Sequence, residues 1–186
     1  MSDERTAILE ATLRLISKNG FHGTAMSKVA KEAGVSTGII YHYFESKDEL
    51  IDELYRTIKR RFAETVLKEF DQNQPLRTQI RQIFENTFRY YIRRPQESAF
   101  VEQYTISPYY RPELELEMSK YYRPAIECVA RGKQEMIIKD FPDAVILSLT
   151  LDVATSLAQK QAAGFINLTD ELIERIIDAL WEAIRQ

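Results

Sequence analysis

The sequence predicts an all-α protein of about nine helices, in which an N-terminal three-helix domain with a helix-turn-helix precedes a larger helical bundle. Three observations lead to this fold class. The 186 residues include only 6 Gly and 6 Pro, too few for the many turns of an all-β fold. Apolar residues recur at helical spacing through nearly the whole chain. A short turn of small residues, centred on Gly34, separates two of these periodic segments.

The composition is that of an ordinary globular protein, with 45% hydrophobic and 28% charged residues. No apolar run approaches the roughly 18 residues that a membrane-spanning helix needs. The opening residues Met1-Ser2-Asp3-Glu4 lack the character of a signal peptide. We therefore expect a cytoplasmic protein with no membrane partner. The single cysteine, Cys128, excludes an intrachain disulfide and a thiolate zinc cluster.

Three helices are predicted in the N-terminal region. The first extends from Asp3 to Lys18, and Asn19-Gly20 ends it. The second extends from Ala25 to Ala33, with Thr24 as its N-cap, and the third from Thr37 to Phe44.

A fourth, long helix begins at Ser46-Lys47-Asp48-Glu49, a capping box in which Ser46 caps an amide and Glu49 reaches back. Its apolar stripe continues to Phe70. We place the domain boundary at its start, which gives residues 1–46 to the helix-turn-helix domain and 47–186 to the larger helical bundle.

The remaining chain predicts further helices at 76–93, 97–106, 112–138, 143–163 and 170–185. Pro124 lies inside the third of these segments, so that segment is expected to be two helices.

The residues around Gly34 have the chemistry of a helix-turn-helix. Two helices that cross steeply need a small residue where they touch, and Ala30 supplies it. Gly34 tolerates the positive φ of a sharp turn, and Ser36 can cap the following helix. Val35 and Ile40 are expected to fill the space beneath the turn.

The helix after this turn is expected to present an outer face that is unusually apolar and aromatic. A DNA major groove offers thymine methyl groups, base edges and phosphates, which suit Ile, Thr and Tyr side chains. The net charge of −3 argues mildly against nucleic-acid binding, and residues 1–50 carry six basic against seven acidic side chains. Phosphate contacts would therefore rest on helix N-termini, hydroxyls and a few lysines.

The segment Arg5-Thr6-Ala7-Ile8-Leu9-Glu10-Ala11, the turn Ala33-Gly34-Val35-Ser36 and the ending Ile40-Tyr41-His42-Tyr43-Phe44 together resemble the TetR family of transcriptional regulators. The resemblance covers residues 3–55. It implies a repressor that acts as a homodimer on a palindromic double-stranded DNA operator and is released by a small molecule. In many members a second threonine stands where this chain has Ala25.

The resemblance also implies roles for single residues. Thr37, Gly38, Ile39 and Tyr41 correspond to base and sugar contacts. Thr24, Tyr43 and Lys47 correspond to phosphate contacts. The full predicted DNA-binding set is Thr24, Ser27, Lys28, Ser36, Thr37, Gly38, Ile39, Tyr41, His42, Tyr43 and Lys47.

Two C-terminal helices predict a homodimer. The segment 143–163 is apolar almost all round, and 170–185 carries a doubled apolar stripe, so both need more than one covered side. Packed on their copies across a two-fold axis, they form a four-helix interface. The alternative is that both complete the core of one protomer. The predicted interface residues are Ile146, Leu149, Val153, Leu157, Ile173, Ile177, Leu180 and Trp181.

The middle of the chain is rich in aromatic residues, which are by default core residues of a helical bundle. Tyrosine hydroxyls need polar partners, so the same cluster also suits a cavity for a lipophilic or aromatic inducer. For Asp152, a position at the dimer seam or on a solvated edge is the stronger alternative. The predicted ligand-binding residues are Phe62, Phe88, Tyr91, Glu102, Tyr104, Tyr122 and Asp152.

Two other functional classes are weighed. A TetR-like co-regulator that binds a protein instead of DNA is supported only by the neutral-to-acidic N-terminal segment, and the salt dependence of binding distinguishes it. An enzyme is not expected, because the sequence has no phosphate loop, nucleophile motif or metal-ligand spacing. No catalytic residue, metal or cofactor is predicted, and His22 and His42 are expected to be surface residues.

Overall fold

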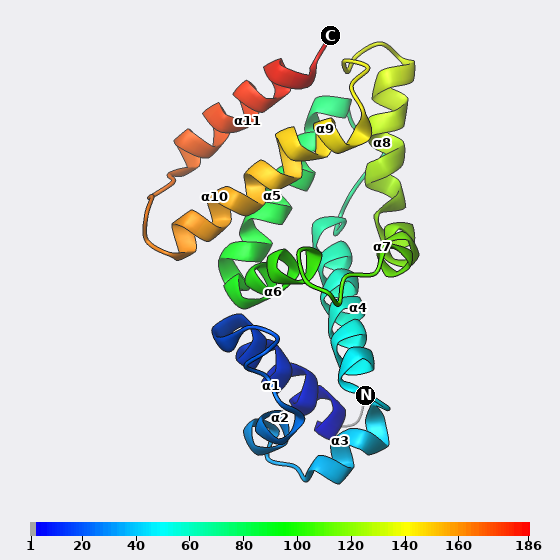
Figure 1. Cartoon of the computed structure of the whole chain (residues 1–186). Helices are drawn as coiled ribbons and strands as arrows, with labels where there is room; N and C mark the ends of the chain where they lie inside the picture. Colours follow the sequence, from blue (N-terminus) through cyan, green and yellow to red (C-terminus); the bar gives the residue numbers. More distant parts are fainter. Residues whose placement is uncertain (1–2) are drawn as a thin grey trace. The chain divides into compact units, whose positions relative to one another are not determined.

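The computed structural model describes residues 3–186, which are folded almost entirely into helices (Figure 1). The described residues form nine helical runs, because α7, η1 and α8 are continuous, as are α9, η2 and α10. The only strand-like feature between residues 3 and 186 is one antiparallel bridge that joins Ile138 and Arg185. The predicted all-α fold is confirmed.

The chain divides into two compact units, and the division falls within α4. Unit 1 consists of the residues up to Arg60 together with Gln96–Met118, and unit 2 consists of Arg61–Pro95 and Ser119–Gln186. This division differs from the boundary predicted at residue 46. The reason is a long-range one: two later helices, α6 and α7, belong to the unit that carries the helix-turn-helix.

Unit 1 is organised around the apolar faces of its first helices, with Ile8, Ile16 and Ile40 fully buried. α1 ends where Gly20 adopts a φ of 68° and donates its N–H to the Ile16 carbonyl over 2.8 Å. The helices of this unit are α1 (Asp3–Asn19), α2 (Met26–Ala33), α3 (Thr37–Tyr43), most of α4 (Lys47–Val66), α6 (Pro95–Thr105) and α7 (Pro112–Ser119).

Unit 2 contains two clusters of buried apolar side chains. One is centred on the aromatic residues of α5, against which α10 packs, and the other on Leu76, Cys128 and Ile146. The helical segments of this unit are α5 (Leu76–Arg93), η1 (Lys120–Tyr122), α8 (Arg123–Gln134), α9 (Asp143–Leu147), η2 (Ser148–Asp152), α10 (Val153–Ala162) and α11 (Asp170–Ile184).

Several helix ends differ from the predicted ones. The N-cap of α2 is Ala25, which provides no side-chain cap, so the prediction that Thr24 caps this helix is wrong. α4 was expected to continue to Phe70 but ends at Val66, and Glu69 then takes a φ of 61°, a left-handed conformation that helical periodicity does not reveal. Pro124 does separate two helices, as predicted, because it lies in the first turn of α8.

The segment predicted as one helix over 143–163 contains the π-helical turn η2. A π turn inserts a residue into the helical register and shifts which side chains share a face. Thr150 is buried here and donates its hydroxyl to the Ile146 carbonyl over 2.7 Å. Ile146 and Ala154 thus both point into the core, whereas Val145 and Leu147 are exposed.

Among the residues that the structure describes, no helix has the length and apolar character needed to cross a bilayer.

Candidate nucleic-acid interface

The turn between α2 and α3 has the predicted geometry. Gly34 adopts a φ of 70° and a ψ of 26°, the left-handed conformation that only glycine takes without strain. The next amide, Val35 N–H, donates to the Ala30 carbonyl over 3.0 Å and so closes the end of α2. Ala30 and Ile40 are buried beneath the turn, and Val35 is half-buried.

α3 is held by its N-cap and presents one side to solvent. The Ser36 hydroxyl accepts the N–H of Ile39 over 3.3 Å, as predicted. Gly38, Tyr41 and His42 are exposed, and the Tyr41 side chain is 53% exposed although it is large and aromatic. Because the Ser36 cap fixes the start of α3, the exposed Tyr41 side chain has a defined position from which it can contact another molecule.

The other predicted members of this surface lie on both sides of α3. Thr37, Ile39 and Tyr43 are half-buried, and Ser27 is exposed on α2. Lys28 is also exposed, and its ammonium group donates to the Gly23 carbonyl over 3.0 Å. The ammonium keeps further N–H groups for an anion, because a lysine has three.

Thr24 occupies a different environment from the predicted one. Its side chain is 1% exposed, and its hydroxyl donates to the Gly20 carbonyl over 2.9 Å. The residue stabilises the loop between α1 and α2, so a phosphate contact by its hydroxyl would require this loop to rearrange.

Tyr43 is bonded to an acidic side chain of α1. Its hydroxyl donates to Oε2 of Glu4 over 3.1 Å. Glu4 was not predicted as part of this surface, because nothing in the linear spacing of residues 4 and 43 shows that they meet.

Lys47, at the start of α4, is held by the backbone of Phe21 and by the ring of Tyr109, two contacts that its position in the sequence does not predict. Its ammonium group donates to the Phe21 carbonyl over 2.6 Å and lies 5.7 Å from the centre of the Tyr109 ring. The rings of Phe21 and Tyr109 are themselves 5.0 Å apart. The loop between α6 and α7 therefore fixes the position of the predicted phosphate-binding lysine.

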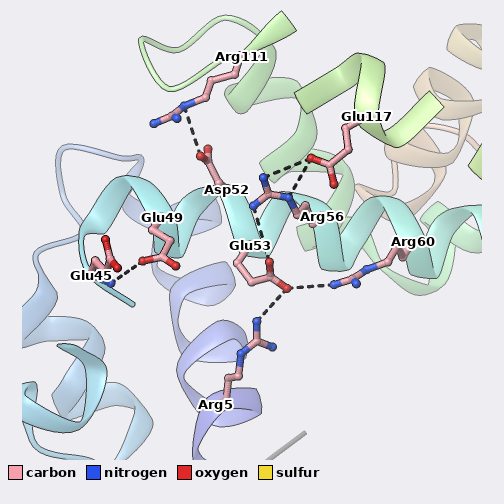
Figure 2. Close-up of polar contacts among 9 residues, drawn as sticks. All are labelled: Arg5, Glu45, Glu49, Asp52, Glu53, Arg56, Arg60, Arg111 and Glu117. Atoms are coloured by element: carbon pink, nitrogen blue, oxygen red, sulfur yellow. Dashed lines mark hydrogen bonds and ion pairs between the residues drawn. The ribbon is translucent and has the colours of Figure 1, made fainter. Parts of the chain in front are cut away.

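After Lys47, α4 carries acidic residues in its first two turns and basic residues in the next two, and several of them tie this helix to other elements of unit 1 (Figure 2). Glu53 binds Arg5 of α1 at 2.9 Å and Arg60 at 3.0 Å. Arg56 reaches Glu117 of α7 at 3.4 Å, and Figure 2 shows these groups meeting above α4.

The capping box of α4 is confirmed in part. The Ser46 hydroxyl accepts the Glu49 N–H over 3.1 Å, as predicted. The Glu49 carboxylate reaches back one residue further than predicted and accepts the N–H of Glu45 over 2.5 Å (Figure 2). The Glu49 carboxylate thus already accepts a hydrogen bond from an amide near the start of this helix.

α4 and α6 each carry a buried side chain with a polar group, Asp52 and Tyr104. Asp52 binds Arg111 through one carboxylate oxygen, 3.3 Å from Nε, while its other oxygen and the Tyr104 hydroxyl are buried and have no hydrogen-bond partner among residues 3–186. Burial raises the pKa of the Asp52 carboxyl, against the opposing effect of Arg111. Burial, helped by the Asp52 charge, raises the pKa of Tyr104 to about 12.

The predicted ligand-binding residues are divided between the two units. In unit 2, the Phe62 ring lies 5.2 Å from Tyr91 and 5.8 Å from Tyr122, and Phe88 belongs to the same core cluster. Tyr90, which was left out of the predicted set, joins this cluster with its ring 5.2 Å from Phe62.

The other three predicted ligand residues are placed differently. Tyr104 belongs to unit 1, where its ring stacks on Tyr55 at 4.3 Å. Glu102 and Asp152 are both exposed, and Asp152 accepts the Ser148 hydroxyl over 2.9 Å. The prediction that Asp152 is an acid in an apolar site is wrong. The alternative, a solvated edge, fits its exposure, because the π turn redirects its side chain.

The predicted dimer residues also separate into two groups. Ile146 and Ile177 are 1% and 5% exposed in the single protomer, so they are core residues and the prediction that they contact a partner is wrong. The others are partly buried against the two core clusters of unit 2: Leu149, Val153, Leu157, Ile173, Leu180 and Trp181. Val145, Leu147 and Leu172 are the large apolar residues that α9 and α11 expose.

Within residues 3–186, no three His, Cys, Asp or Glu side chains are grouped to hold a metal ion. Cys128 is buried in the second core cluster, and burial raises the pKa of its thiol to about 11. A thiol with this pKa is protonated at neutral pH and packs as a small apolar side chain.

Known proteins similar to this chain were found by both sequence and structure. The family profile described as bacterial regulatory proteins, tetR family, matches residues 8–54. The profile of a tetracyclin repressor-like C-terminal domain matches residues 75–185, more than half of the chain.

An HTH-type transcriptional regulator of Haemophilus influenzae is 28% identical over 186 residues, which are 100% of this chain and 97% of the relative. The crystal structure of a TetR family regulator from Marinobacter aquaeolei superposes with a TM-score of 0.93 at 28% identity, covering 98% of this chain and 96% of that one. A structure from Vibrio parahaemolyticus, described as a putative TetR family regulator, has a TM-score of 0.86 at 30% identity and covers 99% of both chains.

Proposed function

Because the chain belongs to the TetR family of helix-turn-helix transcriptional regulators, we propose that it is a repressor which binds a palindromic operator as a homodimer and is released by a lipophilic or aromatic small molecule. The regulator class follows from the family. The repressor role, the operator symmetry and the inducer class are the proposal.

The observation that carries this proposal is the exposure of α3. This helix starts at a serine cap after a left-handed glycine, which sets its direction relative to α2. It exposes the side chains of Tyr41 and His42 and the backbone at Gly38, which has no side chain, to solvent. Aromatic and small apolar groups contact thymine methyl groups and sugars, and hydroxyls contact phosphates.

Operator symmetry follows from dimerisation. A two-fold dimer presents two copies of α3, and each reads one half-site about 34–36 Å from the other, or a multiple of one DNA turn. The exposed apolar side chains of α9 and α11 support such a dimer, because a two-fold interface over these helices would remove them from water.

The aromatic cluster of unit 2 supports an apolar inducer. The rings of Tyr91 and Tyr122 both lie within 6 Å of the Phe62 ring, at 5.2 Å and 5.8 Å, so a flat or lipophilic molecule would meet aromatic side chains there. Phe62 and Lys47 lie on the same helix, α4, so a ligand that displaces Phe62 would move the start of α4 and lower the affinity for DNA.

The experiment that tests the proposal is genomic footprinting with the purified protein, followed by binding to the recovered duplexes at several salt concentrations. We expect inverted-repeat sites and a steep loss of affinity with salt. A panel of fatty acyl, aromatic acid and aromatic cation probes then tests release from DNA. If no duplex sequence is preferred even at low salt, the proposed function is wrong.

A further inference from the structure

The contact between Tyr43 and Glu4 has a consequence for DNA binding. The Tyr43 hydroxyl donates to the Glu4 carboxylate over 3.1 Å. A phenol has one O–H proton to donate, and an ionised carboxylate only accepts. While this bond exists, Tyr43 cannot donate to a DNA phosphate, which is the role that the proposed function gives it.

The Glu4 carboxylate also opposes a phosphate by its charge. A phosphate oxygen that accepts a hydrogen bond from Tyr43 lies about 2.7 Å from the hydroxyl, close to the carboxylate that it replaces. A carboxylate and a phosphate this close to each other repel. In water at low salt, this repulsion lowers the affinity for DNA about three- to five-fold.

Glu4 is held at this position by its neighbour. Arg5 forms an ion pair with Glu53 of α4 at 2.9 Å, and its guanidinium group lies 5.5 Å from the centre of the Phe44 ring. These two contacts fix the first turn of α1 against α4 and the end of α3. The backbone that carries Glu4 is therefore fixed near Tyr43 by contacts that involve neither of these two residues.

We propose that Glu4 limits the affinity of this protein for DNA, because it competes with the phosphate backbone for the Tyr43 hydroxyl. This inference rests on the proposed function. The N-terminal segment of the chain has more acidic than basic residues. One of its carboxylates weakens sequence-independent binding to the phosphate backbone, so base contacts by α3 must supply the rest of the binding free energy.

The test compares Glu4→Gln with Glu113→Gln, which makes the same change in net charge at an exposed residue of α7, outside the helix-turn-helix. Affinities for the operator and for a scrambled duplex are measured by fluorescence anisotropy from low to high salt. For Glu4→Gln we expect about three-fold tighter binding per protomer, or about ten-fold for a dimer, on both duplexes at low salt. The dependence of log K on log salt should steepen by about one per protomer. Glu113→Gln should stay within two-fold of the wild type.

A double-mutant cycle with Tyr43→Phe tests the competition itself. Without the hydroxyl there is nothing for Glu4 to occupy, so Glu4→Gln should gain less in the Tyr43→Phe background than in the wild type. Circular dichroism and Tm verify that each variant is folded. An equal gain in both backgrounds, or a Glu4→Gln protein that behaves like Glu113→Gln, overturns the inference. A wild-type protein that binds no duplex refutes the proposed function instead.

Discussion

Among single residues, Tyr41 gives the most direct test of the reading face of α3. Tyr41→Ala removes a side chain that is 53% exposed, so the fold should be unaffected. Loss of a side chain that contacts bases or sugars should weaken operator binding by about 1–3 kcal/mol per half-site. The measurement is a gel-shift titration on the operator, with Ile106→Ala as the control, which truncates an apolar side chain that is 85% exposed just after α6. Unchanged affinity would show that α3 presents another face.

Asp52 predicts a pH dependence of stability. Its pKa is raised by burial, so the folded state binds a proton more tightly than the unfolded chain does. Below pH 3.8, the ordinary pKa of this group, the Asp52 carboxyl is protonated in both the folded and the unfolded state and does not lower the stability. As the pH rises through the raised pKa, the folded state loses stability relative to a protein without this charge. Asp52→Asn should therefore gain stability relative to the wild type as the pH rises from about 4 towards 7. Urea unfolding at a series of pH values measures this difference, and a difference that is independent of pH would refute it.

Residue types predicted some of these contacts and not others. Ser36 was identifiable as a cap because serine before a short helix after glycine has few other roles. Thr24 has a similar sequence context, but its hydroxyl bonds to the Gly20 carbonyl four residues earlier. Both outcomes are local and nearly equal in energy, so only the folded loop decides between them.

At the scale of helices, the packing of α8 against its neighbours predicts the effect of adding one methyl group. A Cβ on Gly132 would lie 2.5 Å from Cδ2 of Leu76 and 2.6 Å from Cδ1 of Ile138. Gly132→Ala should therefore destabilise the protein by about 1–3 kcal/mol, because the second core cluster is overpacked. Gly38→Ala is the matched control, since its Cβ would meet nothing closer than 3.7 Å. Chemical denaturation of the two variants checks the prediction, and equal stabilities would contradict it.

Helix ends were predictable where proline or glycine marks them. α5 has the predicted bounds, Leu76–Arg93, because Pro75 and Pro95 lie next to its two ends. The π turn at 148–152 was not predictable, because the apolar pattern around it is continuous and a π turn changes the register without changing the composition.

For the molecule as a whole, the least predictable feature was the return of α6 and α7 to the unit of the helix-turn-helix. The contacts that hold them there are long-range. Arg56 binds Glu117, Arg111 binds Asp52 and Tyr55 stacks on Tyr104, all more than forty positions apart in the chain. Periodicity describes each helix by itself and carries no information on which helices meet. The turn between α2 and α3 was predictable because its contacts, Val35 N–H with Ala30 and Ile39 N–H with Ser36, are local.

Dimerisation can be tested without disturbing the protomer, because the structure separates exposed apolar residues from core residues. Leu147 and Leu172 are 43% and 38% exposed on the two helices that are predicted to dimerise. Leu147→Glu combined with Leu172→Glu should yield a folded monomer, since burying two unpaired carboxylates per protomer in an apolar interface costs far more than leaving them in water.

The control is Leu116→Glu, which places a carboxylate on a residue that is 75% exposed on α7. It should remain a dimer. Light scattering after size exclusion gives the mass of each variant, and operator titrations should show that the double variant loses most of its affinity, because a monomer reads one half-site alone. A double variant that stays dimeric would remove α9 and α11 from the interface, and with them the geometric reason for expecting a palindromic operator.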